Sequence, residues 1–270
     1  MPVSPGESLA CVARGYELGF LHEGRIAMHH AFLGIAHVEN GVPLFYDGMN
    51  EHGLCCAALR FADSCKYSEK RNGRICLASF EVIVYALSRF SSVGEAMAGL
   101  AGLLITDECF SDTLPPSPLH WILSDSRESA VIEPTRRGVS ILKAPHGVMT
   151  NAPEMSVQNA IYESGALFDA LDNTSSARYV KAARIAKTCD PVSSLEMLFL
   201  MRALSVPRGL SSAGVRSGDR TVYISVADPM AREYTVVHEE SGVPRKVMLT
   251  DGMMSSGELS VWGIGTDRLI

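Results

Sequence analysis

The most informative stretch of this sequence reads Tyr46-Asp47-Gly48-Met49-Asn50-Glu51-His52-Gly53-Leu54. It lies between two runs of β-favouring residues, 43–46 and 54–61, and its His52-Gly53 step is a turn signal. Two more such runs precede it, at 9–13 and 31–38, with Asn40-Gly41 as a second turn signal. The N-terminal part of the chain therefore predicts a meander of strands.

Helical periodicity follows the meander. Apolar residues recur at intervals of three and four from Phe80 to Leu87 and again from Met97 to Leu104. Ser92 and Glu95 have the spacing of a capping box that starts the second of these helices. We predict two later helices, one that opens at 173–176 and runs through 187, and one that is capped by Ser193 and Glu196.

Strands return between and after these helices, at 119–123, 130–133, 139–142, 221–226, 234–238 and 246–249. The order strands, helices, strands, helices, strands argues against the strict βαβ alternation of a parallel doubly wound sheet. It favours an α+β architecture in which helix layers cover two antiparallel sheets. No linker rich in Gly, Pro or Ser divides the chain, so residues 1–270 are predicted to form a single domain.

The composition excludes several classes of partner. Hydrophobic residues make up 47% of the chain and charged residues 20%, which is ordinary for a protein with a sizeable core. A formal net charge of -6 offers no basic surface for nucleic acid. The longest apolar stretch, 78–105, is interrupted by Glu81, Arg89 and Glu95, so no membrane segment is predicted. The N-terminus shows no secretory signal and seven cysteines are scattered, so we expect a cytoplasmic protein.

Four segments resemble the signatures of one family, the choloylglycine hydrolases and penicillin V acylases. The stretch at 46–54 is similar to its Y/F-D-x-x-N-E-x-G-L signature. The other matches are the L-H-W/Y-x-x-x-D and S-x-V-I/V-E strand pair at 119–134, the V-M/L-T-N-x-P turn at 147–153, and the S-x-S/A-R-F/Y-x-R/K-A-A helix start at 175–183. Val206-Pro207-Arg208-Gly209 is a weaker fifth match. Their shared order from about Arg14 to Glu239 makes coincidence improbable.

The resemblance implies the four-layer αββα sandwich of N-terminal-nucleophile hydrolases, with two stacked antiparallel sheets. It also implies hydrolysis of linear amide bonds by a cysteine at the mature N-terminus. The α-amino group of that cysteine, with a pKa of about 7.7 to 8.0, would take the proton. Arg14-Gly15-Tyr16 resembles the family's V-x-P-R-G/N-Y strand, which puts Met1 just beyond the first strand pair. We therefore expect the nucleophile to be encoded upstream of Met1; a truncated inactive descendant and a partial copy of the protein are the alternatives.

Three residues match functional positions of the family. Asn151 lies in the T-N-x-P motif, which implies a donor in the oxyanion hole; a turn-forming asparagine is the alternative. Arg178 matches the catalytic-site arginine that positions the nucleophile, although such an arginine is otherwise often a solvated surface residue. Arg60 stands where bile-salt hydrolases carry Asn and penicillin V acylases Tyr. It is predicted to bind substrate, with an anionic group as its partner; decay of the site and a solvated loop arginine are the alternatives.

Three cysteines are poor candidates for the nucleophile. Cys11, Cys55 and Cys56 fall inside predicted strands, where burial makes a thiol a small hydrophobic group with a raised pKa. The 270-residue chain itself is therefore predicted to be inactive.

Other polar side chains are predicted to be structural. His29-His30 and His37 are not expected to share a metal ion, because adjacent residues on a strand point to opposite faces. Asp47 and Glu51 are interpreted as parts of a structural turn. No metal or other cofactor is predicted.

Two functional hypotheses remain. The first is an amidase whose small-molecule substrate is a conjugated bile acid, penicillin V or an N-acyl amino compound. The second is a non-catalytic member that binds acyl or bile-acid-like ligands, or a truncated remnant. A homo-oligomer is compatible with the family, but the spacing from Asn151 to Arg178 is shorter than in bile-salt hydrolases, which puts their tetramer in doubt. A missing strand pair would also expose a sheet edge, which predicts low stability or self-association.

Overall fold

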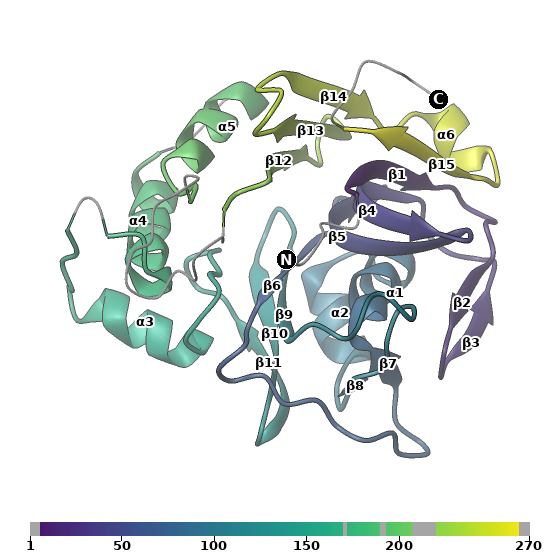
Figure 1. Cartoon of the computed structure of the whole chain (residues 1–270), viewed down its shortest axis with the longest axis horizontal. Helices are drawn as coiled ribbons and strands as arrows, with labels where there is room; N and C mark the ends of the chain where they lie inside the picture. The colour runs from purple at the N-terminus through teal and green to yellow at the C-terminus, as the bar shows by residue number, and fades with distance from the viewer. Residues whose placement is uncertain (1–5, 170–171, 190–192, 207–219, 265–270) are drawn as a thin grey trace.

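A computed structural model describes residues 6–169, 172–189, 193–206 and 220–264 (Figure 1). The weak match that begins at Val206 continues outside the described residues. The predicted Asn40-Gly41 turn is present, and both residues have positive φ angles, 52° and 78°. Such angles at both central positions are typical of the tight turn of a two-residue hairpin, and Glu39 pairs with Val42 across it.

An eight-stranded antiparallel sheet lies at the centre of the structure (Figure 1). Its strand order is β11-β10-β9-β6-β5-β4-β1-β15, so the meander is completed by a strand from the far end of the chain. The strands are β1 Ser8–Val12, β4 Phe32–Glu39, β5 Val42–Asn50, β6 Cys55–Arg60, β9 Leu119–Ser124, β10 Ser129–Thr135, β11 Gly138–Lys143 and β15 Leu259–Gly263.

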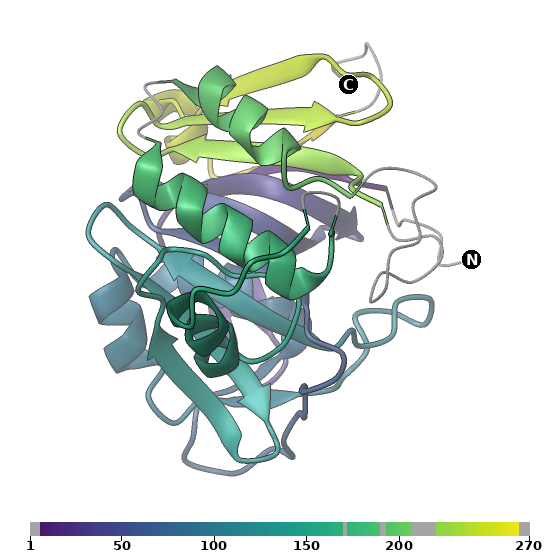
Figure 2. The ribbon, with the colours of Figure 1, turned by 90° about the vertical axis from the view of Figure 1, so that its left-hand side faces the viewer.

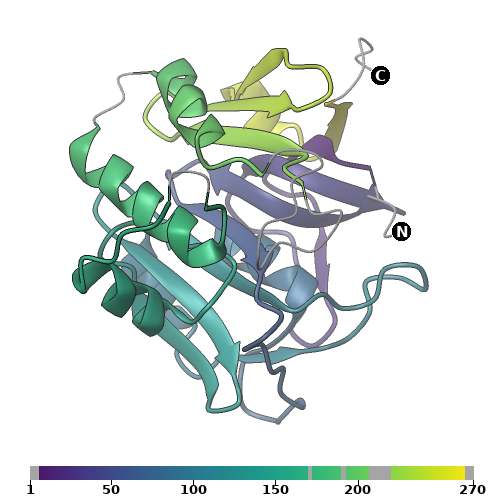
Figure 3. The ribbon, with the colours of Figure 1, turned by 60° about the vertical axis from the view of Figure 1, so that its left-hand side comes forward.

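A three-stranded antiparallel sheet is stacked on this large sheet (Figure 3). It consists of β12 Tyr223–Asp228, β13 Glu233–His238 and β14 Pro244–Met248. Tyr234 and Val236 of β13 share one hydrophobic cluster with Leu33, Ile35 and Met49 of β4 and β5. The two inner faces therefore bury each other, as the sandwich prediction requires.

Helices cover the outer faces of both sheets. On the large sheet, α1 Val82–Arg89 and α2 Val93–Gly99 pack on the face that carries Phe32 and Trp121. On the small sheet, Leu198 of α5 Ser194–Arg202 packs against Ile224 and Val237. The order helix, sheet, sheet, helix confirms the predicted αββα class.

Two further helices lie beside the small sheet, on the same face of the large one (Figure 2). They are α3 Met155–Glu163 and α4 Ser175–Thr188. Met155 and Tyr179 pack against Val131 of β10 in a separate hydrophobic cluster. These two helices continue the inner layer where the small sheet does not reach. The remaining elements are η1 Ser79–Glu81, α6 Asp251–Ser255, the hairpin β2 Leu18–Phe20 and β3 Gly24–Ile26, and the parallel pair β7 Cys76–Ala78 and β8 Leu104–Thr106.

The turn between β5 and β6 is held by Asn50. Its Oδ1 accepts from the backbone N–H groups of His52 and Leu54, at 3.1 Å each. Its Nδ2 donates to the carbonyl oxygens of Leu87 and Phe90, which fastens the turn to the C-terminal end of α1. The buried asparagine of the N-E-x-G-L stretch is therefore a structural hub.

Several local predictions need correction. The helix inferred from Met97 to Leu104 is too long, since α2 ends at Gly99 and Leu104 already belongs to β8. Gly102, with a φ of 79°, reverses the chain between them. Ser92 caps α2 through the Glu95 N–H as predicted, but the Glu95 carboxylate accepts from Ser91 N. The helix α3 and the strand β15 were not predicted. No helix in the described ranges is long and apolar enough to cross a bilayer.

Candidate active site

Asn151 and Arg178 form a hydrogen-bonded pair, although 27 residues separate them. Arg178 Nη2 donates to Asn151 Oδ1 at 2.7 Å, and Arg178 Nε donates to the carbonyl oxygen of Asn173 at 3.3 Å. A guanidinium has donors only, so the Asn151 amide must turn its oxygen toward Arg178. Its nitrogen is left to donate elsewhere. The pair thus joins a positive charge to an oriented N–H donor, which is what stabilises an oxyanion.

The turn that carries Asn151 is tied to the start of α4. Thr150 Oγ1 donates to the Ser175 carbonyl oxygen at 3.0 Å, and Ala152 N donates to Ser175 Oγ at 2.8 Å. Gln158 Nε2 of α3 donates to Thr150 Oγ1 at 2.8 Å. Thr174 caps α4 through the N–H of residue 177. Because these bonds join the turn, α3 and α4, the distance between Asn151 and Arg178 is held by the fold.

Burial tunes the Arg178 side chain. Desolvation lowers the pKa of Arg178 from its ordinary value, yet a guanidinium of this kind stays charged at any pH at which the protein is folded. The adjacent Tyr179 is fully buried against Met155. Arg178 is therefore a half-buried cation on a helix that is anchored in the core by its neighbour Tyr179.

A cavity of about 700 Å³ opens between the two sheets and α5. Its walls include Ser225 and Ala227 of β12, Ser194 and Met197 of α5, and Ser124 of β9. In the described part of the chain β12 pairs only with β13, so its other edge has no strand beside it. A cavity along an unpaired edge is room into which additional chain could fit.

Three thiols that lie on strands, those of Cys11, Cys55 and Cys56, are poor nucleophiles. Burial raises the pKa of Cys11 to about 12, and desolvation followed by the charge of Asp47 raises that of Cys55 to about 12. Desolvation also raises the pKa of Cys56. Cys11 and Cys56 are buried as predicted, whereas Cys55 is only partly buried and lines the cavity. Among the described residues, no thiol hydrogen-bonds to Asn151 or Arg178.

In the part of the chain that the structure describes, Arg60 makes no hydrogen bond to Asn151 or Arg178. It is the last residue of β6 and is exposed. Within the described ranges its side chain makes no hydrogen bond or ion pair. Leu59, which precedes it, packs with the cluster of Met155 and Tyr179, while Ala58 packs with the core under α1. The substrate-binding role of Arg60 stays a prediction.

Asp47 links the two sheets, a connection that no local sequence signal indicates. Its carboxylate accepts from the hydroxyls of Tyr223 at 2.8 Å, Ser225 at 3.2 Å, and Tyr234. Desolvation raises the pKa of Asp47, and these hydrogen bonds offset the rise only in part. Glu51 is also structural, since it accepts from Arg14 and from Ala31 N.

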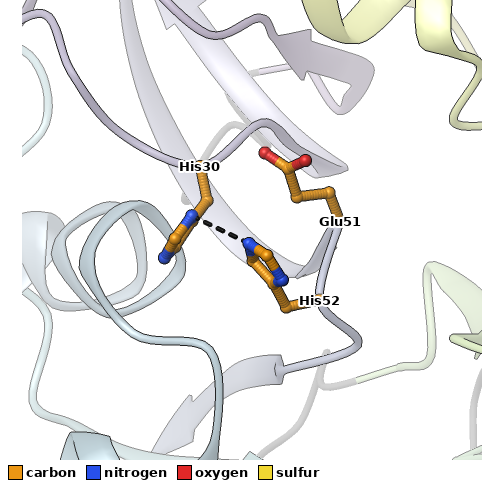
Figure 4. A group of neighbouring side chains, drawn as sticks. All are labelled: His30, Glu51 and His52. Carbon is orange, nitrogen blue, oxygen red and sulfur yellow. Dashed lines mark hydrogen bonds between the residues drawn. The ribbon is translucent and has the colours of Figure 1, made fainter.

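His30, Glu51 and His52 lie together (Figure 4), and His52 lines the cavity. The His30 ring is hydrogen-bonded to the His52 ring and not to the ring of His29. The His29 ring instead bonds to the backbone carbonyl oxygens of Tyr16 and His30. His30 is also not part of a strand, so the alternation argument did not apply to it. The turn at Gly53 brings His52 close to His30. This proximity could not be predicted from the sequence, because 22 residues separate the two histidines.

Comparisons with known proteins agree with the fold and the motifs. A sequence model described as "Linear amide C-N hydrolases, choloylglycine hydrolase family" matches residues 1–175. A bile salt hydrolase/transferase of Lactiplantibacillus plantarum is 38% identical over 156 residues, which cover 58% of this chain and 48% of that protein. A bile salt hydrolase/transferase of Bifidobacterium longum subsp. longum is 24% identical over 289 residues, covering 95% and 91%.

Solved structures show the same fold. A variant of the conjugated bile acid hydrolase from Clostridium perfringens matches with a TM-score of 0.88 at 22% identity, over 100% of this chain and 93% of that one. A penicillin V acylase from Agrobacterium tumefaciens matches with a TM-score of 0.76 at 23% identity, over 95% and 83%. The chain spans about half the length of the first curated relatives that it matches.

Proposed function

Because the chain belongs to the choloylglycine hydrolase family of linear amide C–N hydrolases, we propose that it is a hydrolase of linear carbon–nitrogen amide bonds. Its substrate is a conjugated bile acid, penicillin V or another N-acyl amino compound. The observation that supports this most directly is the Asn151–Arg178 pair, since it supplies an oriented donor beside a half-buried cation. Both residues were predicted from the sequence alone.

Amide hydrolysis needs a nucleophile, a base and donors for the oxyanion. In this proposal Asn151 Nδ2 donates to the negative charge that develops on the carbonyl oxygen. Arg178 is a positioning residue, because it holds the amide oxygen of Asn151. A thiolate attacks the carbonyl carbon, the amine leaves with a proton, and water then hydrolyses the thioester.

The nucleophile of the proposal is a cysteine at a mature N-terminus, from chain encoded upstream of Met1. Its own α-amino group, with a pKa of about 7.7 to 8.0, is the base. Two observations support an outside source. The thiols of Cys11 and Cys55 have raised pKa values, and the unpaired edge of β12 borders a cavity. Arg60 is proposed to meet an anionic group of the substrate at the exposed end of β6.

The test compares the 270-residue chain with a version extended by its in-frame upstream codons. Release of glycine or taurine from bile-acid conjugates, and cleavage of penicillin V, are measured by mass spectrometry. We expect the extended version to turn over at least one of these substrates and the 270-residue chain none. Asn151→Ala in the extended version should lower kcat about 100- to 1000-fold. Asn72→Ala, at an exposed loop position, is the matched control and should retain full activity.

Three outcomes contradict the hydrolase. The upstream codons could contain an in-frame stop, the extended version could fail to release amine, or Asn151→Ala could retain full kcat. Stabilisation by bile acids without turnover in either version would favour the non-catalytic binding protein.

A further inference from the structure

The imidazoles of His30 and His52 face each other across a short gap. His30 Nδ1 and His52 Nε2 are 3.1 Å apart, and their ring planes are inclined at 75° (Figure 4). The Glu51 carboxylate lies next to them, with the three ligand atoms all within 4.8 Å of one another. His52 is exposed and lines the 700 Å³ cavity, so the group is open to solvent.

From this geometry we infer that His30, His52 and Glu51 form a binding site for a divalent transition-metal ion of the Zn²⁺ class. The inference is independent of the proposed hydrolase, because none of these three residues is assigned to amide cleavage. The ligand set, two imidazole nitrogens and one carboxylate oxygen, is a common one for catalytic zinc sites with an open fourth position.

The spacing of the two nitrogens fits tetrahedral coordination. Zinc–nitrogen bonds of about 2.0 to 2.1 Å at a tetrahedral angle place two ligand nitrogens about 3.3 to 3.4 Å apart. The observed 3.1 Å needs an adjustment of a few tenths of an ångström, within the reach of side-chain rotation. The carboxylate must move further, since its ligand atom can lie up to 4.8 Å from an imidazole nitrogen.

The two imidazoles can both offer a lone pair to the ion. Each ring does so when its proton lies on the nitrogen that is turned away from the other ring. For His30 that nitrogen is Nε2, where Ser91 Oγ lies at 3.4 Å and can accept the proton. A hydrogen-bond partner on the far nitrogen is the usual support of a metal-ligating histidine. The acidic Glu95 nearby adds a charge that favours a cation.

Arg14 and the metal ion would compete for the Glu51 carboxylate. Its Nε donates to Glu51 Oε1 at 2.8 Å, and its Nη2 contacts Oε2. Oε1 also accepts from Ala31 N, whereas Oε2 keeps a lone pair for a metal. The Arg14 side chain is 52% exposed and can turn toward solvent, while that of Glu51 is 4% exposed. Metal binding should therefore tighten when Arg14 is removed.

The experiment titrates the metal-free 270-residue chain with Co²⁺, which reports its ligands in the visible spectrum, and then displaces it with Zn²⁺. We expect one Co²⁺ per chain, with d–d bands of a tetrahedral nitrogen and oxygen site and without thiolate charge-transfer bands. His52→Ala should weaken binding more than about 100-fold, and Ser91→Ala about 10-fold, as for an outer-sphere partner. His238→Ala is the matched control and should bind unchanged. Arg14→Ala should bind more tightly than the parent.

The inference is overturned if the parent chain binds no Co²⁺ below about 1 mM, which corresponds to a binding free energy of roughly -4 kcal/mol. It is equally overturned by thiolate bands, which would assign the ion to cysteines, or by unchanged binding in His52→Ala. Circular dichroism of each variant checks the fold, and the gain in Arg14→Ala tests the site without removing a ligand.

Discussion

The orientation of the Asn151 amide depends on the Arg178 guanidinium. The pKa of the Asp47 carboxyl depends on its desolvation and on three hydroxyl groups that donate to it. In both cases a single side chain takes its properties from partners that lie far away in sequence. Arg178 fixes which end of the Asn151 amide can donate. Tyr223, Ser225 and Tyr234 surround the Asp47 carboxylate with donors but do not restore the solvation that it loses between the sheets.

The raised pKa of Asp47 predicts a pH-dependent stability. A carboxyl whose folded pKa lies above its unfolded value of about 3.9 contributes stability below that value, and the contribution is lost as pH rises through the folded pKa. The free energy of unfolding of the parent, minus that of Asp47→Asn, should therefore fall as pH rises from about 4 to 8. Urea denaturation at several pH values measures this difference.

Asp125 supplies a matched control of opposite sign. Its burial alone would raise the pKa, but backbone N–H bonds from Val93, Arg127 and Glu128 together lower it. Its contribution is present above the unfolded pKa and is lost as pH falls through the folded pKa. The free energy of unfolding of the parent, minus that of Asp125→Asn, should thus rise with pH over the acidic range. A difference for Asp47 that is flat or rising would contradict its raised pKa.

At the scale of the element, the bonds at the start of α4 place Asn151 beside Arg178, and the length of the helix is less important for this. Thr150 and Ser175 join the turn before α3 to the first residue of α4, and Gln158 closes the arrangement from α3. The helix has its ordinary N-cap at Thr174 in addition. The Asn151–Arg178 pair, whose members lie on two different elements, is therefore held by side-chain bonds between those elements and not by either helix alone.

Thr150→Val tests this arrangement. The substitution leaves the Gln158 amide and the Ser175 hydroxyl without their buried partner, which should lower the free energy of unfolding by about 1 to 3 kcal/mol. Chemical denaturation measures the change. Thr188→Val, at an exposed position at the end of α4, should stay within about 0.5 kcal/mol. Equal effects of the two substitutions would show that the bonds of Thr150 do not hold the turn.

At the scale of the whole molecule, the two stacked sheets differ in their number of strands. The large sheet has eight strands, whereas the described small sheet has three and leaves one edge of β12 unpaired. Unpaired backbone N–H and carbonyl groups of an edge strand can pair with another chain. The cavity beside β12 gives access to that edge.

We therefore expect the 270-residue chain to self-associate. Its weight-average mass in sedimentation equilibrium should rise with concentration, and its melting temperature should be low for its size. The version extended upstream, if its added strands cover β12, should remain closer to a single mass over the same range. A monomeric 270-residue chain with a cooperative melt at an ordinary temperature would contradict this expectation.

Local features of the fold could be read from the sequence. Asn40-Gly41 makes its turn, and Ser92 and Ser193 cap their helices through the N–H groups three residues on, because the partners of these residues lie within a few positions. Asn151 and Arg178 were found through their motifs, and the structure brings them together. Their catalytic roles, and that of Arg60, stay predictions.

What the sequence determined by itself is most of the strands and helices, their αββα class and the family, since these depend on periodicity, caps and motifs along the chain. Only the tertiary structure decided which distant side chains meet. Tyr234 reaches Asp47 across 187 residues, β15 closes the large sheet against β1, and His30 faces His52 and not its neighbour in the sequence. Such contacts depend on how whole sheets pack, and no periodicity within a strand records that packing.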